Sequence, residues 1–149
     1  MEFHREQDSQ HYGIYAYARG EITVTIPSAL EPGPAPDNGG NVEQLHLPMR
    51  REILRRSLVI MPSALIRDWE PQSFESLAVD HFRTLAELDI ELVLFGSGGA
   101  LRWPDPGLLS PLMEKSIGIE VMDTGAACRT YNILQADQRR FAAALLMID

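Results

Sequence analysis

Residues 90–99 read IELVLFGSGG, a nearly unbroken apolar run that ends in three glycines and a serine. A short apolar run of this kind is typical of a strand buried on both faces, as in a parallel sheet covered by helices. The glycines predict a tight turn at the carboxyl end of that strand. This stretch therefore indicates an α/β fold.

Helix and strand patterns alternate around this strand. Apolar side chains recur at three- and four-residue spacing over 73–88, which predicts an amphipathic helix capped by the serine at its start. Further along, residues 108–116 predict a helix, 118–123 a second strand, and 124–135 a helix with Thr124 as its cap. The order strand, helix, strand, helix implies a right-handed parallel unit.

The first half of the chain is richer in strand patterns. Residues 12–26 alternate between apolar and polar side chains around a turn at Gly20-Glu21, which predicts a β-hairpin with one buried face. A buried strand is predicted at 58–61 and a weaker one at 42–47. The last segment, 139–148, is ambiguous, because three consecutive alanines favour a helix whereas its short apolar character favours a strand.

The domain organisation is predicted to be simple. Residues 1–10 are expected to form a disordered leader, and 11–149 a single domain. Within it, 31–41 is expected to be a flexible loop, because the stretch 31–40 contains three prolines and three glycines. Too little chain precedes this loop to build a separate core.

Composition excludes several functional classes. The 149 residues carry a net charge of −8, which argues against a cationic nucleic-acid groove. The single cysteine excludes an intramolecular disulfide and fits a reducing compartment. No apolar run reaches the roughly 20 residues that span a bilayer, and the polar N-terminus does not resemble a signal peptide. We expect a soluble, cytoplasmic, bacterial protein, with a monomer favoured.

The glycine-rich turn is the strongest candidate site. Glycines at the carboxyl end of a parallel strand let a ligand approach the backbone, and their N–H groups can hold an anion. A second set of polar residues follows the next predicted strand, so both sets are expected around one cleft. The candidate ligand-binding residues are Gly96, Ser97, Gly98, Gly99, Thr124 and Arg129. The alternative is a purely structural turn, since neither a phosphate-loop lysine nor the dinucleotide spacing is present.

Other reactive groups give weaker signals. Cys128 is a possible reactive thiol, because a helix N-terminus and the adjacent Arg129 can lower a thiol pKa; the alternative is a buried, packed side chain. The four histidines lack metal-ligand spacing, so we expect no metal and no cofactor. Leu101, Trp103 and Pro104 indicate an apolar loop that contacts a partner; the alternative is a loop folded over the sheet.

Two stretches resemble the signatures of the Mth-like domain family, a family of unknown function. They are LVLFGSG at 92–98 and GIEVMDTGAACRTYNIL at 118–134. The resemblance covers roughly residues 12–147 and implies a compact α/β domain with a mixed sheet, in which the last segment is a strand. Relatives in this family include a mitochondrial assembly factor for respiratory complex I and an adipogenesis-associated protein. Compared with the mitochondrial relatives, this sequence is expected to lack a transit peptide and to carry a proline- and glycine-rich insert at 31–40.

The residues and the resemblance together favour a non-enzymatic protein-interaction or assembly domain with a protein partner. The resemblance alone adds the suggestion of respiratory-complex assembly. The alternative is a small-molecule or anion-binding protein, with or without enzymatic activity, that uses the cleft after the strand at 90–95. An exposed apolar patch near Trp69 or Trp103 would favour the first reading, and a deep cleft with convergent polar groups the second.

Overall fold

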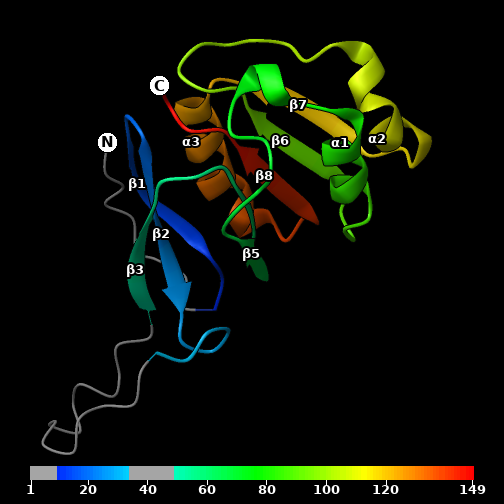
Figure 1. Ribbon diagram of the computed structural model, residues 1–149. Coiled ribbons are helices and arrows are strands. Elements are labelled where there is room, and N and C mark those ends of the chain that lie inside the picture. The colour runs from blue at the N-terminus through cyan, green and yellow to red at the C-terminus, as the bar shows by residue number, and fades with distance from the viewer. Residues whose placement is uncertain (1–9, 34–48) are drawn as a thin grey trace, which may run out of the picture.

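Two β-sheets and three α-helices make up the computed structural model, which describes residues 10–33 and 49–149 (Figure 1). An antiparallel sheet has the order β1-β2-β3, and a mixed sheet has the order β5-β4-β8-β6-β7. The strands are β1 (Gly13–Ala18), β2 (Glu21–Pro27), β3 (Met49–Leu54), β4 (Leu58–Met61), β5 (Ala64–Ile66), β6 (Leu92–Gly96), β7 (Gly118–Met122) and β8 (Phe141–Leu145). The helices are α1 (Val79–Ala86), α2 (Ser110–Glu114) and α3 (Thr124–Leu134).

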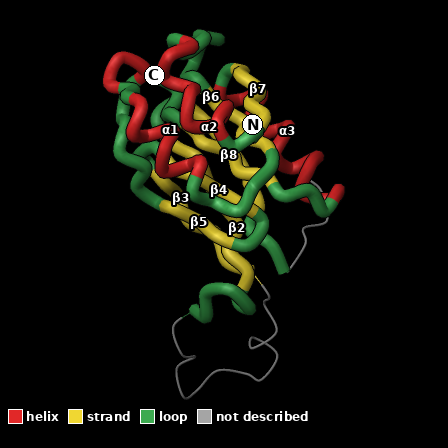
Figure 2. Tube along the Cα trace, turned by 90° about the vertical axis from the view of Figure 1, so that its right-hand side faces the viewer, coloured by secondary structure: helices red, strands yellow, loops and turns green. Residues whose placement is uncertain are grey.

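The mixed sheet confirms the expected α/β architecture. β6 is parallel to both β7 and β8, while β4 is antiparallel to β8. Figure 2 shows α1 and α2 on one side of these strands and α3 on the other. Alternate residues of β6 supply two cores: Leu92 and Leu94 pack towards α3 and the antiparallel sheet, whereas Val93 and Phe95 pack towards α1 and α2.

The final segment is the central strand β8. Its three alanines, Ala142, Ala143 and Ala144, are fully buried and would favour a helix by intrinsic propensity. Pairing with β6 on one side and β4 on the other overrides that preference, because both edges of the strand gain a ladder and both faces are covered. The strand implied by the family resemblance is thus confirmed.

The predicted hairpin is present as β1 and β2, but the predicted helix over 73–88 is divided. Ser73 caps only a short 3-10 turn, Phe74–Ser76, after which the backbone is extended at Leu77 and Ala78. α1 then begins at Val79, where Nδ1 of His81 accepts the N–H of Ala78 at 2.9 Å. A local side-chain cap thus starts a new helix in the middle of a continuous apolar pattern.

Three of the sequence-based expectations fall wholly or mostly outside the described residues, and a fourth is modified. The weak strand predicted at 42–47 lies outside them, as do residues 1–9 of the predicted leader over 1–10 and residues 34–41 of the predicted loop. The helix predicted at 108–116 is a 3-10 turn, Pro106–Leu109, followed by the short α2.

α3 joins the two sheets by closing the outer edge of β1. The side-chain amide of Asn132 donates to the carbonyl of Ile14 at 2.7 Å and accepts the N–H of Ile14 at 3.1 Å, as a neighbouring strand would. The hydroxyl of Tyr131 donates to the carbonyl of Tyr12 at 2.7 Å. These contacts satisfy backbone groups that an edge strand otherwise leaves open.

We expect Asn132→Ala to lower the free energy of unfolding by roughly 1–3 kcal/mol, because it leaves the N–H and C=O of Ile14 without partners. Urea denaturation measures the loss. Ile133→Ala is the matched control, since that neighbouring side chain is 57% exposed and should change stability by less than about 0.5 kcal/mol. Equal effects of the two substitutions would contradict the role assigned to Asn132.

Candidate functional site

The glycine-rich turn lies at the carboxyl end of β6, as the sequence predicts, and is fixed by hydrogen bonds. The N–H of Ser97 donates to the carbonyl of Met122 at 2.9 Å, which joins the turn to the end of β7. The Ser97 hydroxyl donates to the carbonyl of Ala100 at 2.7 Å and accepts the N–H of Arg102 at 3.0 Å. Ser97 is buried, and its hydrogen bonds therefore fix the conformation of the turn and of the loop that follows.

Thr124 ties this turn to the rest of the sheet. Its hydroxyl accepts the N–H of Gly98 at 2.9 Å and donates to the carbonyl of Leu146 at 2.7 Å. Its own N–H donates to the carbonyl of Gly98 at 2.9 Å. The prediction that Thr124 caps α3 is wrong: Asp123 is the cap, through its carboxylate and the N–H of Ala126, which leaves the threonine hydroxyl free to bridge the strands.

Two of the glycines are required by geometry. A Cβ at Gly96 would come within 2.9 Å of both the Leu145 side chain and the Thr124 hydroxyl. Gly98 has φ of +105°, a backbone conformation that residues with a Cβ rarely adopt. The turn is therefore built for close packing against Thr124 and the end of β8.

A small cavity of about 190 Å³ opens beside the turn and is lined by Ser97, Gly98 and Gly99 among other residues. Small-molecule pockets usually measure about 300–1,000 Å³. The N–H groups of Ser97 and Gly98 already have acceptors, so two of the amides that would hold an anion are engaged.

The charges around this cavity do not favour an anion either. Arg102 lies over the ring of Phe74 at 4.1 Å and pairs with Glu75 at 2.8 Å. The hydrogen bond from Arg102 lowers the pKa of the Glu75 carboxyl, while the charge of Asp149 opposes that shift. One guanidinium thus faces two carboxylates, because Asp149 lines the same cavity.

The structure brings five of the six candidate residues together and separates the sixth. Gly96, Ser97, Gly98 and Gly99 form the turn, and Thr124 bonds to it. Arg129 is not part of the cavity lining; its guanidinium donates instead to the hydroxyl of Tyr17 on β1. These contacts pack the ends of neighbouring strands against one another.

Cys128 is fully buried in the core between α3 and the two sheets. Burial raises the pKa of its thiol to about 12, and the nearby charge of Arg129 lowers it less than burial raises it. The thiol is thus protonated at neutral pH, whereas thiolate is the nucleophilic form.

The two tryptophans have opposite environments. Trp69 is 5% exposed and packs edge-on against Phe82 and Phe95 in the core beneath α1. Trp103 is 66% exposed and Leu101 is 55% exposed, both on the loop that Ser97 organises. An exposed apolar surface is therefore present at Trp103 and absent at Trp69.

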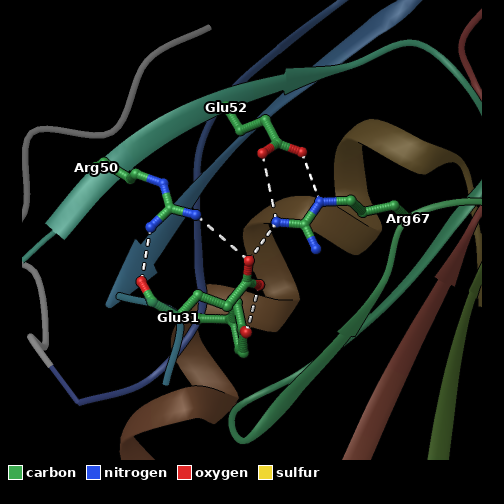
Figure 3. A network of polar contacts seen from close by, with 5 residues as sticks. Glu31, Arg50, Glu52 and Arg67 are labelled. Carbon is green, nitrogen blue, oxygen red and sulfur yellow. Dashed lines mark hydrogen bonds and ion pairs between the residues drawn. The ribbon is translucent and has the colours of Figure 1, made fainter. Parts of the chain in front are cut away.

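A network of charged side chains joins the antiparallel sheet to the turn after β5 (Figure 3). The Arg67 guanidinium pairs with Glu31 at 2.7 Å and with Glu52 at 2.7 Å. Arg50 donates to the carbonyl of Glu31 at 2.6 Å, and the Tyr12 hydroxyl donates to the Glu31 carboxylate at 2.6 Å.

The network shifts the pKa values of its members. Hydrogen bonds from Arg67 and Tyr12 lower the pKa of Glu31. Burial, together with the hydrogen bond to Glu31, raises the pKa of Tyr12 to about 12. The sequence predicts Glu31 at the start of a flexible loop. Its partners are distant along the chain, and no local pattern indicates them.

The described residues contain no group of three or more side chains able to hold a metal ion. Within the same ranges, no helix is both long and apolar enough to cross a bilayer.

The chain is similar to a described protein family and to several known proteins. The family described as "Protein of unknown function (DUF498/DUF598)" matches residues 42–146. Curated relatives are named NADH dehydrogenase (ubiquinone) 1 alpha subcomplex assembly factor 3. The protein of Xenopus tropicalis is 30% identical over 89 residues, which are 58% of this chain and 48% of the relative. The protein of Danio rerio is 32% identical over 58% of this chain and 51% of its own length. The chain thus spans about half the length of these relatives.

Solved structures share the whole fold. A crystal structure of a Bordetella parapertussis protein is similar with a TM-score of 0.67 and 25% identity, over 92% of this chain and 96% of that chain. A solution structure from Bordetella pertussis, described as a Mth938-like domain, has a TM-score of 0.65 at 24% identity, over 99% and 92% of the two chains. The Mth938-like fold implied by the two sequence signatures is confirmed.

We expect Thr124→Val to lower the free energy of unfolding by about 2–4 kcal/mol, because it leaves the N–H of Gly98 and the carbonyl of Leu146 buried without partners. Thr124→Ser keeps the hydroxyl and removes one methyl group, so its loss should be near 1 kcal/mol. Chemical denaturation of both variants checks the difference, and a serine variant as unstable as the valine variant would contradict it.

We expect the contribution of Glu31 to stability to depend on pH. Its pKa is lowered in the folded state, so the stabilisation is fully present above the unfolded pKa of about 4.5 and is lost as pH falls through the lower folded value. Glu31→Gln should cost roughly 1 kcal/mol at pH 7, since the group is partly exposed, and almost nothing once the carboxyl is protonated. Denaturant midpoints for both proteins between pH 7 and pH 3 measure this, and a constant difference across that range would refute it.

Proposed function

Because the chain belongs to the DUF498/DUF598 family, whose description assigns no function, we propose from its surface that it is a non-enzymatic protein-interaction domain. The loop that follows the glycine-rich turn is its contact surface, with Leu101 and Trp103 as the apolar anchors. The observation that carries this proposal is the exposure of Trp103, 66% of which faces solvent in a loop whose base is held by buried hydrogen bonds.

An exposed tryptophan on a fixed loop suits a binding anchor. Tryptophan is enriched among the side chains that contribute most to protein–protein binding, because it buries a large area with little loss of conformational freedom. Ser97 fixes the loop through Ala100 and Arg102 on either side of Leu101. Trp103 is therefore presented by an ordered backbone, which reduces the entropy that binding must overcome.

The relatives suggest the kind of partner. Several are named as assembly factors of an NADH dehydrogenase subcomplex. By analogy we propose that the partner is a protein subunit that is being assembled into a larger complex. The aligned part is 30% identical and covers about half of those relatives, so we carry over only the class of partner and not the contact residues.

The alternative, a small-molecule or anion site beside the turn, has less support. The cavity is small, two of its amides are already bonded, and two carboxylates face its single guanidinium. These contacts are those of a turn that stabilises the fold. Trp103, on the exposed loop next to the cavity, is by contrast not part of the buried core.

We expect Trp103→Ala to weaken binding of a partner without changing the melting temperature, because the side chain contributes little to the core. The tagged chain is used to capture a partner from cells, the captured protein is identified and purified, and its dissociation constant is measured. A rise of about 30-fold, equivalent to 2 kcal/mol, is expected for a central anchor.

Ile133→Ala is the matched control, since Ile133 is an apolar side chain of similar exposure on α3. Its dissociation constant should equal that of the wild type. The proposal fails if Trp103→Ala binds as tightly as the wild type, or if Ile133→Ala weakens binding as much.

A further inference from the structure

We propose that the outer edge of β7 is a second docking site, which receives an extended segment of a partner protein with a basic residue opposite Glu120. The segment adds a sixth strand to the mixed sheet. This inference rests on the proposed function only in taking a protein as partner; its surface and its residues are different.

The backbone hydrogen bonds of β7 show which of its residues face outward. The N–H of Gly118 donates to Glu91, and the carbonyl of Met122 accepts from Ser97, both on the β6 side. In a parallel ladder the N–H and C=O of one residue point the same way, and the direction alternates along the strand. The N–H and C=O groups of Ile119 and Val121 therefore point away from β6, and no described residue bonds to them.

The other sheet edges are protected in ways that β7 is not. The edge of β1 is closed by Asn132 and Tyr131. β5 has three residues, and β3 carries three charged side chains among six. Short length, charge and side-chain cover are the usual protections against strand addition. β7 reads GIEVM, and its single charge is Glu120.

Glu120 decides which kind of strand fits. Its side chain is exposed and makes no ion pair with any described residue. A second copy pairing antiparallel with its two-fold axis at residue 120 would place Glu120 opposite itself, and like charges opposite one another are destabilising. A basic residue at that position is favourable, so charge complementarity favours a different protein over this symmetric pairing.

The flanking positions require apolar side chains. Ile119 and Val121 pack only partly into the core on the side of α1 and α2. α2 contacts β7 and carries Met113, which is 68% exposed. Residues opposite Ile119 and Val121 would project onto this same face, so the fitting segment alternates apolar, basic, apolar.

The probe for this site is a backbone-cyclised hairpin peptide that presents the strand TVKVT, since a preorganised strand loses less entropy on binding. Amide hydrogen exchange is followed by NMR in the free and the peptide-bound protein. We expect the amides of Ile119 and Val121 to exchange fast in the free protein and to slow about tenfold at nine-tenths occupancy. The Glu120 amide, which points at β6, should be protected in both states.

Three variants separate the possible outcomes. Glu120→Lys should reverse a preference of roughly two- to fivefold for TVKVT over the matched probe TVEVT. Val121→Pro removes an outward N–H, which an edge strand tolerates, and should abolish binding while the remaining amides keep their protection. Trp103→Ala should leave probe binding unchanged, so failure of the loop proposal and failure of this one are distinguishable.

Two results overturn the inference. One is protection of Ile119 and Val121 in the free protein, whether constant or rising with protein concentration, since the edge would then be covered already or paired with a second copy. The other is an unchanged exchange rate at millimolar TVKVT, or equal binding of the two probes to wild type and to Glu120→Lys.

Discussion

The buried hydroxyl of Thr124 is the interaction on which the C-terminal half of the protein depends. It bonds the N–H of Gly98 after β6 and the carbonyl of Leu146 after β8, at the residue where α3 begins. Both backbone groups are buried away from water, so each needs a hydrogen-bond partner. The segment after β6, the segment after β8 and the start of α3 must therefore lie together for Thr124 to bond both groups. That meeting sets the position from which α3 crosses the sheet, and hence its reach to Asn132 and the edge of β1.

Local sequence patterns predicted those elements whose secondary structure is determined by residues close in sequence. The apolar run of β6, its glycine-rich turn and the first hairpin all follow from short-range signals. The residue that caps α3 could not be predicted in this way, because Asp123 and Thr124 are both good cap residues. The strand ends beside them engage the Thr124 hydroxyl and leave the cap to Asp123. β8 was ambiguous for a related reason: its alanines become a strand only through pairing with β6 and β4.

The candidate site was likewise predicted in part. The turn and Thr124 come together as expected, since parallel strands end at a common edge. Arg129 does not, because on the face of α3 that it occupies its nearest partner is Tyr17 of the hairpin. The outward groups of β7 depend on the order of strands in the sheet, which no sequence pattern states. The edge of β7 is thus a surface that the sequence does not indicate, whereas the exposed loop at Trp103 is one that it does.

The bond between Arg50 and the Glu31 carbonyl has a consequence for engineering the chain. It links a residue shortly after β2 to a residue of β3, and Arg67 pairs with the side-chain carboxylate of the same Glu31. Chain added between fixed ends raises the closure entropy slowly, by about 0.6 kcal/mol for each doubling of length. Lengthening the chain between Glu31 and Arg50 should therefore cost little stability, so a reporter or tag could be encoded inside the sequence instead of at a terminus.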